Sequence, residues 1–139
     1  MQTILFDLDV YPYQTDFMGH VNNTVYIQWM EVGRVKLLEA VAMPTHEIAQ
    51  RGFAPVLVQT HINYKSPLYL GDRPQVELWL SELRGASAVM QFRFHNDQQV
   101  LVAEGQQTGL FVNTQTMRPK RLTAEEEALF TAYLEPISD

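Results

Sequence analysis

The sequence predicts an α+β domain in which a five-stranded antiparallel sheet is wrapped around one long central helix. Residues 23–43 repeat apolar side chains with the period of a helix. One strand-like segment precedes them, and four strand-like segments joined by short turns follow. Strands joined by short turns pair antiparallel, and one helix packed on such a sheet is an α+β architecture.

Composition and charge limit the classes of protein to which this chain can belong. Its 139 residues, 46% of them hydrophobic and 19% charged, fit a single domain over residues 1–139. A net charge of −6 argues against a general nucleic-acid binder, which carries a basic excess. Because there is no cysteine, disulfides, thiolate catalysis and cysteine-bound zinc are excluded.

The N-terminal residues do not have the pattern of a secretory signal. They lack a basic start and hold two aspartates inside their apolar run. No uninterrupted apolar stretch of about 18 residues occurs, so no membrane span is predicted. We therefore expect a cytoplasmic protein with no membrane partner.

Residues 4–13 form the first expected strand. Phe6, Leu8 and Val10 alternate with mostly polar side chains at period two. Pro12 has no N–H to donate, so the strand ends there or lies at an edge of the sheet.

The long helix is expected to begin beside Asn22 and Asn23, which are both good N-cap residues, and to end before Pro44. Its apolar face is broad, as in a helix that a sheet wraps. The face is formed by Tyr26, Met30, Gly33, Leu37 and Ala40. A glycine inside a helix costs about 1 kcal/mol against alanine, so Gly33 indicates the close approach of another backbone.

A charged pair lies on the same helix. Glu31 and Arg34 are three residues apart, a spacing at which side chains can meet. We interpret them as a solvated surface pair worth a few tenths of a kcal/mol.

The second half of the chain is mostly strands. Residues 45–53 predict a short helix that Thr45 caps and Gly52 ends. Strands are expected over residues 56–65, 75–83, 87–95 and 101–113, with a turn at Asn96-Asp97 between the last two.

Two further features concern the end of the chain. Gly105 and Gly109 lie on one face of the last strand and indicate a close backbone approach there, which we expect to be to the long helix. Residues 123–134 predict a terminal helix, because Thr123 and Glu126 have the spacing of a capping box.

The polar segment before the long helix is the candidate site. Asp16 ends a polar elbow, and a tight turn at Met18-Gly19 follows it. The first N–H groups of a helix have no partner inside the helix, and the helix dipole favours negative charge beside them. A carboxylate placed there is suited to acyl chemistry.

This segment resembles a known family. Residues 13–23, Tyr-Gln-Thr-Asp-Phe-Met-Gly-His-Val-Asn-Asn, followed by Tyr26 and by Glu31-Val32-Gly33-Arg34, resemble the hotdog-fold acyl-CoA thioesterases of the 4-hydroxybenzoyl-CoA thioesterase-like group. The later segments Ile62-Asn63-Tyr64, Pro67, Gly71-Asp72, Phe111-Val112-Asn113 and Arg118-Pro119 agree with the same family. The resemblance covers about residues 5–122 and implies a hotdog fold.

The resemblance implies roles for the residues of the motif. Asp16 would attack the thioester carbonyl or activate a water, and the N–H of Asn23 would hold the oxyanion. His20 would orient the acid or the substrate, or fix the loop. Gly19 would let the substrate approach the backbone closely. Substrate contacts are also assigned to Asn22, which can instead cap the helix, and to Tyr26, which can instead be a core residue.

The sequence departs from the family pattern at one position. Many members carry a first acid two residues before the catalytic acid, and Gln14 stands there in this chain. Asp16 itself is present, so activity is expected, while the substrate range differs from that of members with both acids.

Coenzyme A carries phosphates, so its site should be basic. The candidates are Lys65, Arg84 and Arg93, on or beside the later strands. The acyl pocket is expected to use Trp29, Phe53, Tyr64 and Trp79 as walls, which would favour apolar or aromatic acyl groups.

No cofactor or metal is expected. The four histidines are scattered and lack acids at ligand spacing, and the chain has no glycine-rich phosphate loop. Two alternatives to hydrolysis stay open: a hotdog hydratase or dehydratase that pairs His20 with an acid, and a non-catalytic module that binds acyl thioesters or acyl carrier protein. A sheet of this size leaves a face or edge to cover, so we expect a homodimer or homotetramer.

Overall fold

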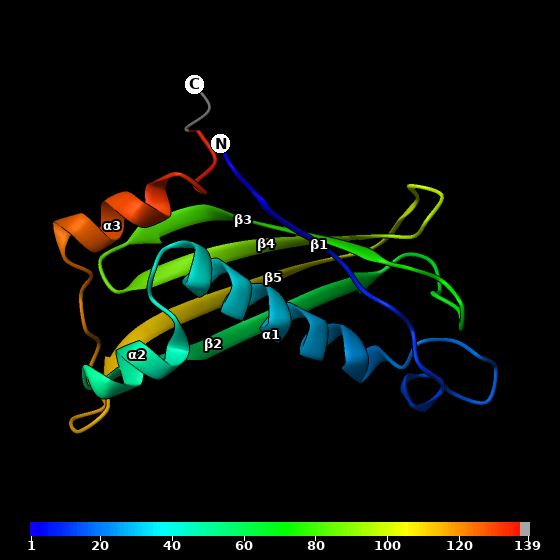
Figure 1. Ribbon diagram of the computed structural model, residues 1–139, viewed down its shortest axis with the longest axis horizontal. Coiled ribbons are helices and arrows are strands. Elements are labelled where there is room, and N and C mark those ends of the chain that lie inside the picture. Colours follow the sequence, from blue (N-terminus) through cyan, green and yellow to red (C-terminus); the bar gives the residue numbers. More distant parts are fainter. Residues whose placement is uncertain (137–139) are drawn as a thin grey trace.

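The computed structural model describes residues 1–136 and shows a curved antiparallel sheet wrapped around one helix (Figure 1). The strands are β1 (Ile4–Asp7), β2 (Phe53–Tyr64), β3 (Gln75–Arg84), β4 (Ser87–His95) and β5 (Leu101–Asn113). The helices are the 3-10 turn η1 (Pro12–Gln14), α1 (Asn23–Ala40), α2 (Thr45–Gln50) and α3 (Ala124–Thr131). The predicted α+β class, with five antiparallel strands and one long helix, is confirmed.

The strand order is β1-β3-β4-β5-β2. The short turns between consecutive strands predict that β2 pairs with β3. This prediction was wrong, because β2 and β3 are not neighbours in the sheet. Instead β2 runs along β5, from Phe53 opposite Asn113 to Tyr64 opposite Ala103. The segment between Tyr64 and Gln75 crosses to the other side of the sheet, where β3 pairs with β1 and β4. This places the twelve residues of β2 at one edge of the sheet.

The core lies between α1 and the sheet. Four of the five residues of the predicted apolar face are buried: Tyr26, Met30, Gly33 and Leu37. Ala40, the fifth, is exposed at the last position of the helix, so its place in the face was wrong. A Cβ added at Gly33 would lie 3.2 Å from Phe92 Cε1 and 3.4 Å from Phe6 Cε1. The groups that approach this glycine are aromatic side chains, so the expectation of a neighbouring backbone was wrong.

Of the two glycines of β5, Gly105 lies close to the long helix, as predicted, and Gly109 does not. A Cβ added at Gly105 would lie 2.9 Å from Met30 Cε of α1 and 3.2 Å from the His61 carbonyl oxygen. The end of the Met30 side chain therefore rests against the strand backbone at Gly105, where a larger residue would have to displace it. At Gly109 the nearest neighbour is instead Met90 of β4, at 3.2 Å.

Several element boundaries differ from the prediction. The first strand ends at Asp7, because the chain then turns into η1 at Pro12. The long helix ends at Ala40, because Ala42 takes a left-handed backbone conformation with φ of 59°. The second strand starts at Phe53, earlier than expected, because it continues to pair with β5 as far as Asn113.

Both shorter helices also differ slightly. Pro44, and not Thr45, is the N-cap of α2. The capping box of α3 is confirmed: Thr123 N donates to Glu126 Oε1 at 2.8 Å, and Glu126 N donates to Thr123 Oγ1 at 3.1 Å. This helix ends at Thr131, because the chain then binds β3 through backbone hydrogen bonds.

The two short helices and the loop that carries Asp16 lie at opposite ends of the molecule. α2 and α3 lie at the end where α1 finishes, while the loop that precedes α1 lies at the opposite end (Figure 1). No helix within residues 1–136 is long and apolar enough to cross a bilayer.

Candidate active site

The loop that carries Asp16 is bound to the segment after β2. Thr15 and Val21 form an antiparallel bridge that closes the loop. Val21 N donates to the Leu68 carbonyl oxygen at 2.8 Å, and Leu70 N donates to the Gly19 carbonyl oxygen at 3.0 Å. These backbone bonds fix the loop against the sheet.

Asp16 shapes the turn that follows it. Its Oδ1 accepts hydrogen bonds from Met18 N at 2.9 Å and from His20 N at 3.1 Å. Gly19 allows the turn because its φ is 73°, in the left-handed region. The Asp16 side chain is exposed, and its other oxygen, Oδ2, has no hydrogen-bond or ion-pair partner within residues 1–136. One oxygen thus holds the loop while the other is free to react.

The start of α1 offers a free donor beside this loop. Asn22 is the N-cap, and its Oδ1 accepts from Thr24 N at 3.0 Å. In the described part of the chain, the N–H of Asn23 has no acceptor. An unpaired N–H at the first position of a helix is the group that can hold an oxyanion.

Tyr64 holds the same helix start from the side of the sheet. Its hydroxyl donates to the Asn23 carbonyl oxygen at 3.1 Å. Sequence reasoning assigned Tyr64 to the acyl pocket and missed this link, because the two residues are 41 positions apart. The family-like Asn-Tyr dipeptide at the end of β2 was the only signal in the sequence that could have pointed to it.

His20 and Tyr26 lie near the loop in different environments. The His20 ring packs edge-on against Tyr69, with centroids 4.9 Å apart, and its imidazole makes no hydrogen bond among the described residues. Tyr26 is only 2% exposed, in an aromatic cluster with Trp29, Tyr64 and Phe94. Burial, and then the neighbouring Tyr64, raises the pKa of Tyr26 to about 12. Tyr26 therefore lies in the core, and a substrate contact for it stays a prediction.

Gln14, which replaces the first acid of the family, is a structural residue here. It is 9% exposed, and its Oε1 accepts from Tyr11 N at 2.8 Å. Its carbonyl oxygen accepts from Asn22 N at 2.8 Å. The side-chain amide thus closes the η1 turn at Tyr11, and the backbone carbonyl ties η1 to the residue that caps α1.

Two of the three basic residues proposed for coenzyme A flank Glu104, with Arg93 opposite it in the β4–β5 ladder, while Arg84 pairs elsewhere. Lys65 Nζ lies 3.4 Å from Glu104, Arg84 Nη2 lies 3.6 Å from Glu82, and the Arg93 guanidinium lies 4.9 Å from the Trp79 ring centroid. Their roles in binding stay predictions.

One further basic side chain lies near Arg84. The Arg121 guanidinium lies 3.6 Å from where a Cβ of Gly85 would stand, next to Arg84. Lys120, in the same segment after β5, is turned elsewhere: its Nζ lies 3.8 Å from Glu126 Oε1 and 4.3 Å from the Phe53 ring centroid.

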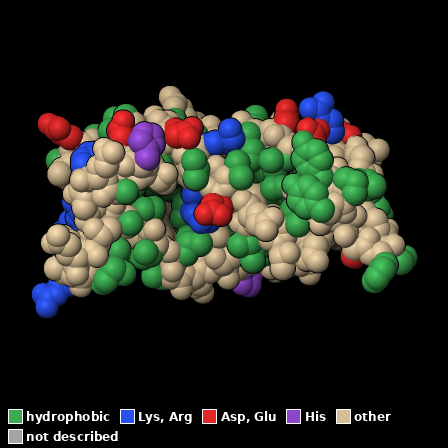
Figure 2. All heavy atoms as spheres, turned by 60° about the horizontal axis from the view of Figure 1, so that its bottom comes forward, with side chains coloured by type: hydrophobic (Ala, Val, Ile, Leu, Met, Phe, Trp, Pro, Cys, Tyr) green, Lys and Arg blue, Asp and Glu red, His purple; other side chains and the backbone are tan. Residues whose placement is uncertain are grey.

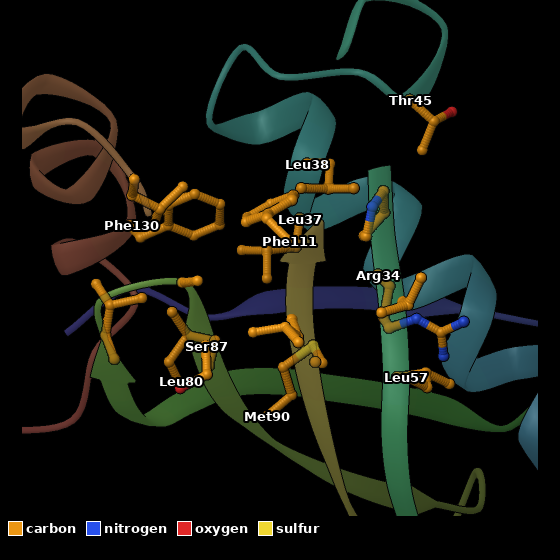
Figure 3. Close-up of a pocket in the computed structure, with 18 of the residues that line it drawn as sticks. Arg34, Leu37, Leu38, Thr45, Leu57, Leu80, Ser87, Met90, Phe111 and Phe130 are labelled. Atoms are coloured by element: carbon orange, nitrogen blue, oxygen red, sulfur yellow. The ribbon is translucent and has the colours of Figure 1, made fainter. Parts of the chain in front are cut away.

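A cavity of about 660 Å³ lies between the second half of α1 and the sheet (Figure 3). Its walls come from α1, β2, β3, β4, β5 and α3, and include Leu37, Leu57, Leu80, Met90, Phe111 and Phe130. The predicted walls Trp29, Phe53, Tyr64 and Trp79 do not line it, so that prediction was wrong for this cavity. The first two are buried in the core, Tyr64 holds the helix start, and Trp79 lines a shallow depression with Arg93.

The cation Arg34 faces this cavity. Arg34 Nη1 donates to Gln107 Oε1 at 2.6 Å, and Gln107 Nε2 donates to Thr60 Oγ1 at 3.2 Å. Gln107 is fully buried, and burial lowers the pKa of the Arg34 guanidinium. The nearby Glu31 carboxylate acts in the opposite direction and raises that pKa. No ion pair joins Glu31 to Arg34 within 4.0 Å in the described chain and Arg34 is half-buried, so the expected solvated surface pair was wrong. Arg34 turns inward because Gln107 gives it an acceptor.

The cavity and Asp16 lie at different ends of α1. Arg34 is eleven residues beyond Asn23, which is about 16 Å along a helix that rises about 1.5 Å per residue. Figure 1 shows the loop before α1 and the α3 end of the sheet at opposite ends of the molecule. A single chain therefore holds the carboxylate and the cavity apart.

A five-stranded antiparallel sheet around one long helix, with an acid in the loop before that helix, defines the hotdog class of fold. Solved structures of this class superpose closely. DHNA-CoA thioesterase from Staphylococcus aureus gives a TM-score of 0.88 over 95% of this chain and 91% of its own, at 18% identity. The S. aureus protein SAV2348, solved in complex with CoA, gives a TM-score of 0.91 over 99% of this chain and 89% of its own, at 15% identity. At these identities the likeness concerns the fold.

The sequence comparison defines the family. Residues 10–129 match the model of the thioesterase-like superfamily, and the chain belongs to it. The putative acyl-CoA thioesterase YneP of Bacillus subtilis is 26% identical over 127 residues, 91% of this chain and 92% of that protein. The long-chain acyl-CoA thioesterase FadM of Escherichia coli is 33% identical over 94 residues, 65% of each chain. The predicted family is confirmed.

Proposed function

We propose that this protein is an acyl-CoA thioester hydrolase in which Asp16 supplies the oxygen nucleophile. The observation that carries the proposal is an exposed carboxylate and a backbone N–H at the start of α1. Within residues 1–136, one oxygen of the carboxylate and this N–H both lack a hydrogen-bond partner. Membership of the thioesterase-like superfamily and the names of YneP and FadM support the same reaction.

The chemistry needs an oxygen nucleophile and an oxyanion site. Asp16 either attacks the thioester carbonyl through Oδ2 or takes a proton from a water that attacks. The carbonyl oxygen becomes an oxyanion, which the Asn23 N–H stabilises beside the positive end of the helix dipole. The C–S bond then breaks and coenzyme A leaves as a thiolate that takes up a proton. If a water attacked, Asp16 passes on the proton it took and the free acid forms directly. If Asp16 attacked, a mixed anhydride with Asp16 forms, and a water then hydrolyses it to the free acid and the restored carboxylate. His20 stays a candidate for orienting the acid.

The active site is shared by two copies of the chain. β2 carries the helix start at one end, through Tyr64, and the cavity wall at the other end, through Val56 and Leu57. These ends are about 26 Å apart at about 3.3 Å per residue. Antiparallel pairing of two β2 edges across a twofold axis puts the Tyr64 end of each copy beside the Val56 end of the other.

The surface supports such a homodimer. Leu57, Val58 and Tyr64 are exposed on the free edge, and Phe17 and Met18 are exposed beside Asp16. Contiguous exposed apolar side chains mark interaction surfaces. Figure 2 shows hydrophobic side chains on both sides of a hollow that contains acidic and basic side chains. A tetramer of two dimers stays a prediction.

Coenzyme A is the proposed thiol carrier. Arg84 and Arg121, beside the Gly85 turn, offer its phosphates a pair of basic side chains. Lys65 and Arg93 remain candidates. The plant relatives ATL2 and ATL3 are named acyl-acyl carrier protein thioesterases, so acyl carrier protein is the alternative carrier. A cytoplasmic location, expected from the sequence, stays a prediction.

A thiol-release assay with aromatic and with short, medium and long acyl-CoAs tests the proposal. Wild-type protein should release free thiol, and Asp16→Asn should lose at least about 100-fold in kcat. Asp9→Asn, which removes an exposed partner of Arg73 away from the loop, is the matched control and should keep full turnover. Equal turnover by Asp16→Asn and wild type would refute the role of Asp16, and tight acyl-CoA binding without thiol release would favour the non-catalytic module.

A further inference from the structure

The walls of the cavity change in character from one end to the other. Glu31, Arg34 and Thr45 are the charged and polar residues near its outer part, where Leu57 of the edge strand is also exposed. Farther in, the walls are Leu80, Met90, Phe111 and Phe130, which are all buried. The inner part of the cavity is therefore lined by hydrocarbon.

Ser87 is the polar residue that the β3–β4 turn contributes to the lining, and it is only half-buried. Ser87 Oγ donates to the Arg84 carbonyl oxygen at 3.1 Å, so its oxygen can still accept a hydrogen bond. The buried walls offer no such group, and a polar group placed against them would lose its water without gaining a hydrogen bond, which costs about 1–3 kcal/mol. The cavity thus favours a molecule whose inner end is purely apolar.

The terminal helix closes the inner end. Phe130 of α3 faces the cavity beside Phe111, with ring centroids 6.2 Å apart (Figure 3). The segments on both sides of α3 are fixed by backbone hydrogen bonds, from Leu122 N to the Gly85 carbonyl oxygen at 3.2 Å and from Leu80 N to the Tyr133 carbonyl oxygen at 2.8 Å. Phe130 is therefore a fixed wall.

We propose that the cavity binds the hydrocarbon chain of a fatty acyl thioester, with the methyl end against Phe130, so that α3 sets the longest chain accepted. This inference rests on the proposed function and names its substrate class. The volume of about 660 Å³ lies within the range of about 300–1,000 Å³ that small-ligand sites occupy. A hydroxylated aromatic acyl group would bring hydroxyls against buried apolar walls, where the half-buried Ser87 hydroxyl is the nearest polar group.

The dependence of binding on chain length provides the test. Non-hydrolysable thioether analogues of acyl-CoA, with saturated chains of increasing length, are titrated into the full-length protein by calorimetry. Each methylene that enters the cavity should lower Kd about fourfold, the factor expected for a buried CH₂ group. Once the chain reaches Phe130, Kd should stop falling.

Three variants locate the inner end. Phe130→Ala should move the plateau to chains longer by roughly two carbons, because it opens space at the wall. Ala88→Phe, which fills the cavity from β4, should move the plateau to shorter chains. Leu129→Ala is the matched control, because Leu129 is 47% exposed on the same helix, and it should leave the profile unchanged.

The outcomes separate this inference from the proposed function. The inference would be overturned if the plateau stays unchanged in Phe130→Ala and Ala88→Phe. It would also be overturned if a hydroxybenzoyl analogue binds more tightly than any saturated chain, or if no saturated chain binds. The predicted profile in a protein that hydrolyses no acyl-CoA would support the inference and overturn the hydrolase proposal. If circular dichroism shows that Phe130→Ala is unfolded, Phe130→Leu and Ala88→Phe decide the question.

Discussion

Tyr64→Phe tests whether the sheet positions the oxyanion donor. The change removes one hydroxyl and breaks one hydrogen bond, from Tyr64 to the Asn23 carbonyl oxygen at 3.1 Å. A partly exposed hydrogen bond of this kind contributes about 0.5–1.5 kcal/mol to the free energy of unfolding. The phenyl ring keeps its edge-on contact with Tyr26, so the packing is retained.

Tyr64→Phe should lower kcat more clearly than it lowers the free energy of unfolding. Complete removal of an oxyanion-hole donor costs about 100- to 1,000-fold in kcat. Tyr64→Phe leaves the Asn23 N–H in place but loosens the first turn, so we expect about a tenfold loss of kcat with KM little changed. Thiol release and urea unfolding at one fixed protein concentration measure the two effects.

A matched control isolates the hydroxyl. Tyr13 is 82% exposed on the loop before Asp16 and stacks on Tyr11. Tyr13→Phe should change neither kcat nor the unfolding midpoint. If Tyr64→Phe loses stability but keeps full kcat, the link holds the fold together and has no part in positioning the donor.

Three further predictions concern the core. Gly105→Ala should destabilise the protein by about 1–3 kcal/mol through overpacking, and the added change Met30→Leu should recover part of the loss in denaturant unfolding. Gln107→Ala should cost about 2 kcal/mol, because the half-buried Arg34 loses its acceptor, whereas Gln107→Glu should retain most of the stability. Tyr26 should ionise near pH 12 in an ultraviolet absorbance titration, against about 10 in the unfolded chain. The unfolded state releases this proton first, so Tyr26 should make stability fall between about pH 10 and pH 12, and ionisation of all tyrosines near pH 10 would contradict its burial.

The fold and the motif could be predicted because their signals are local. The helical period of residues 23–43 and the alternation of the strands depend on neighbours in the sequence. The polar elbow at Asp16 and the capping asparagine Asn22 lie within a few residues of the helix that they serve. Gly105 also gave a correct prediction, because a glycine inside a strand often marks a bulge or a close backbone approach.

The errors arose where partners are distant in the sequence. Gln107 is 73 residues from Arg34, and the sequence around Arg34 does not indicate that its guanidinium has a hydrogen-bond acceptor on β5. The aromatic residues Trp29 and Phe53 looked like pocket walls but pack in the core. The cavity is lined mostly by apolar side chains of several elements, Phe111 and Phe130 among them, and the strand order β1-β3-β4-β5-β2 brings these elements together.

Mixed dimers test the central claim, that Asp16 of one copy acts on an acyl group held in the cavity of the other. One chain carries Asp16→Asn, and the second carries Ala88→Trp to block the cavity; each alone should be inactive. A dimer of one copy of each contains one intact site if the site is shared, so refolding an equal mixture should restore about one quarter of wild-type thiol release. No recovery in a mixture that forms mixed dimers would contradict the shared site and place the whole reaction within a single chain.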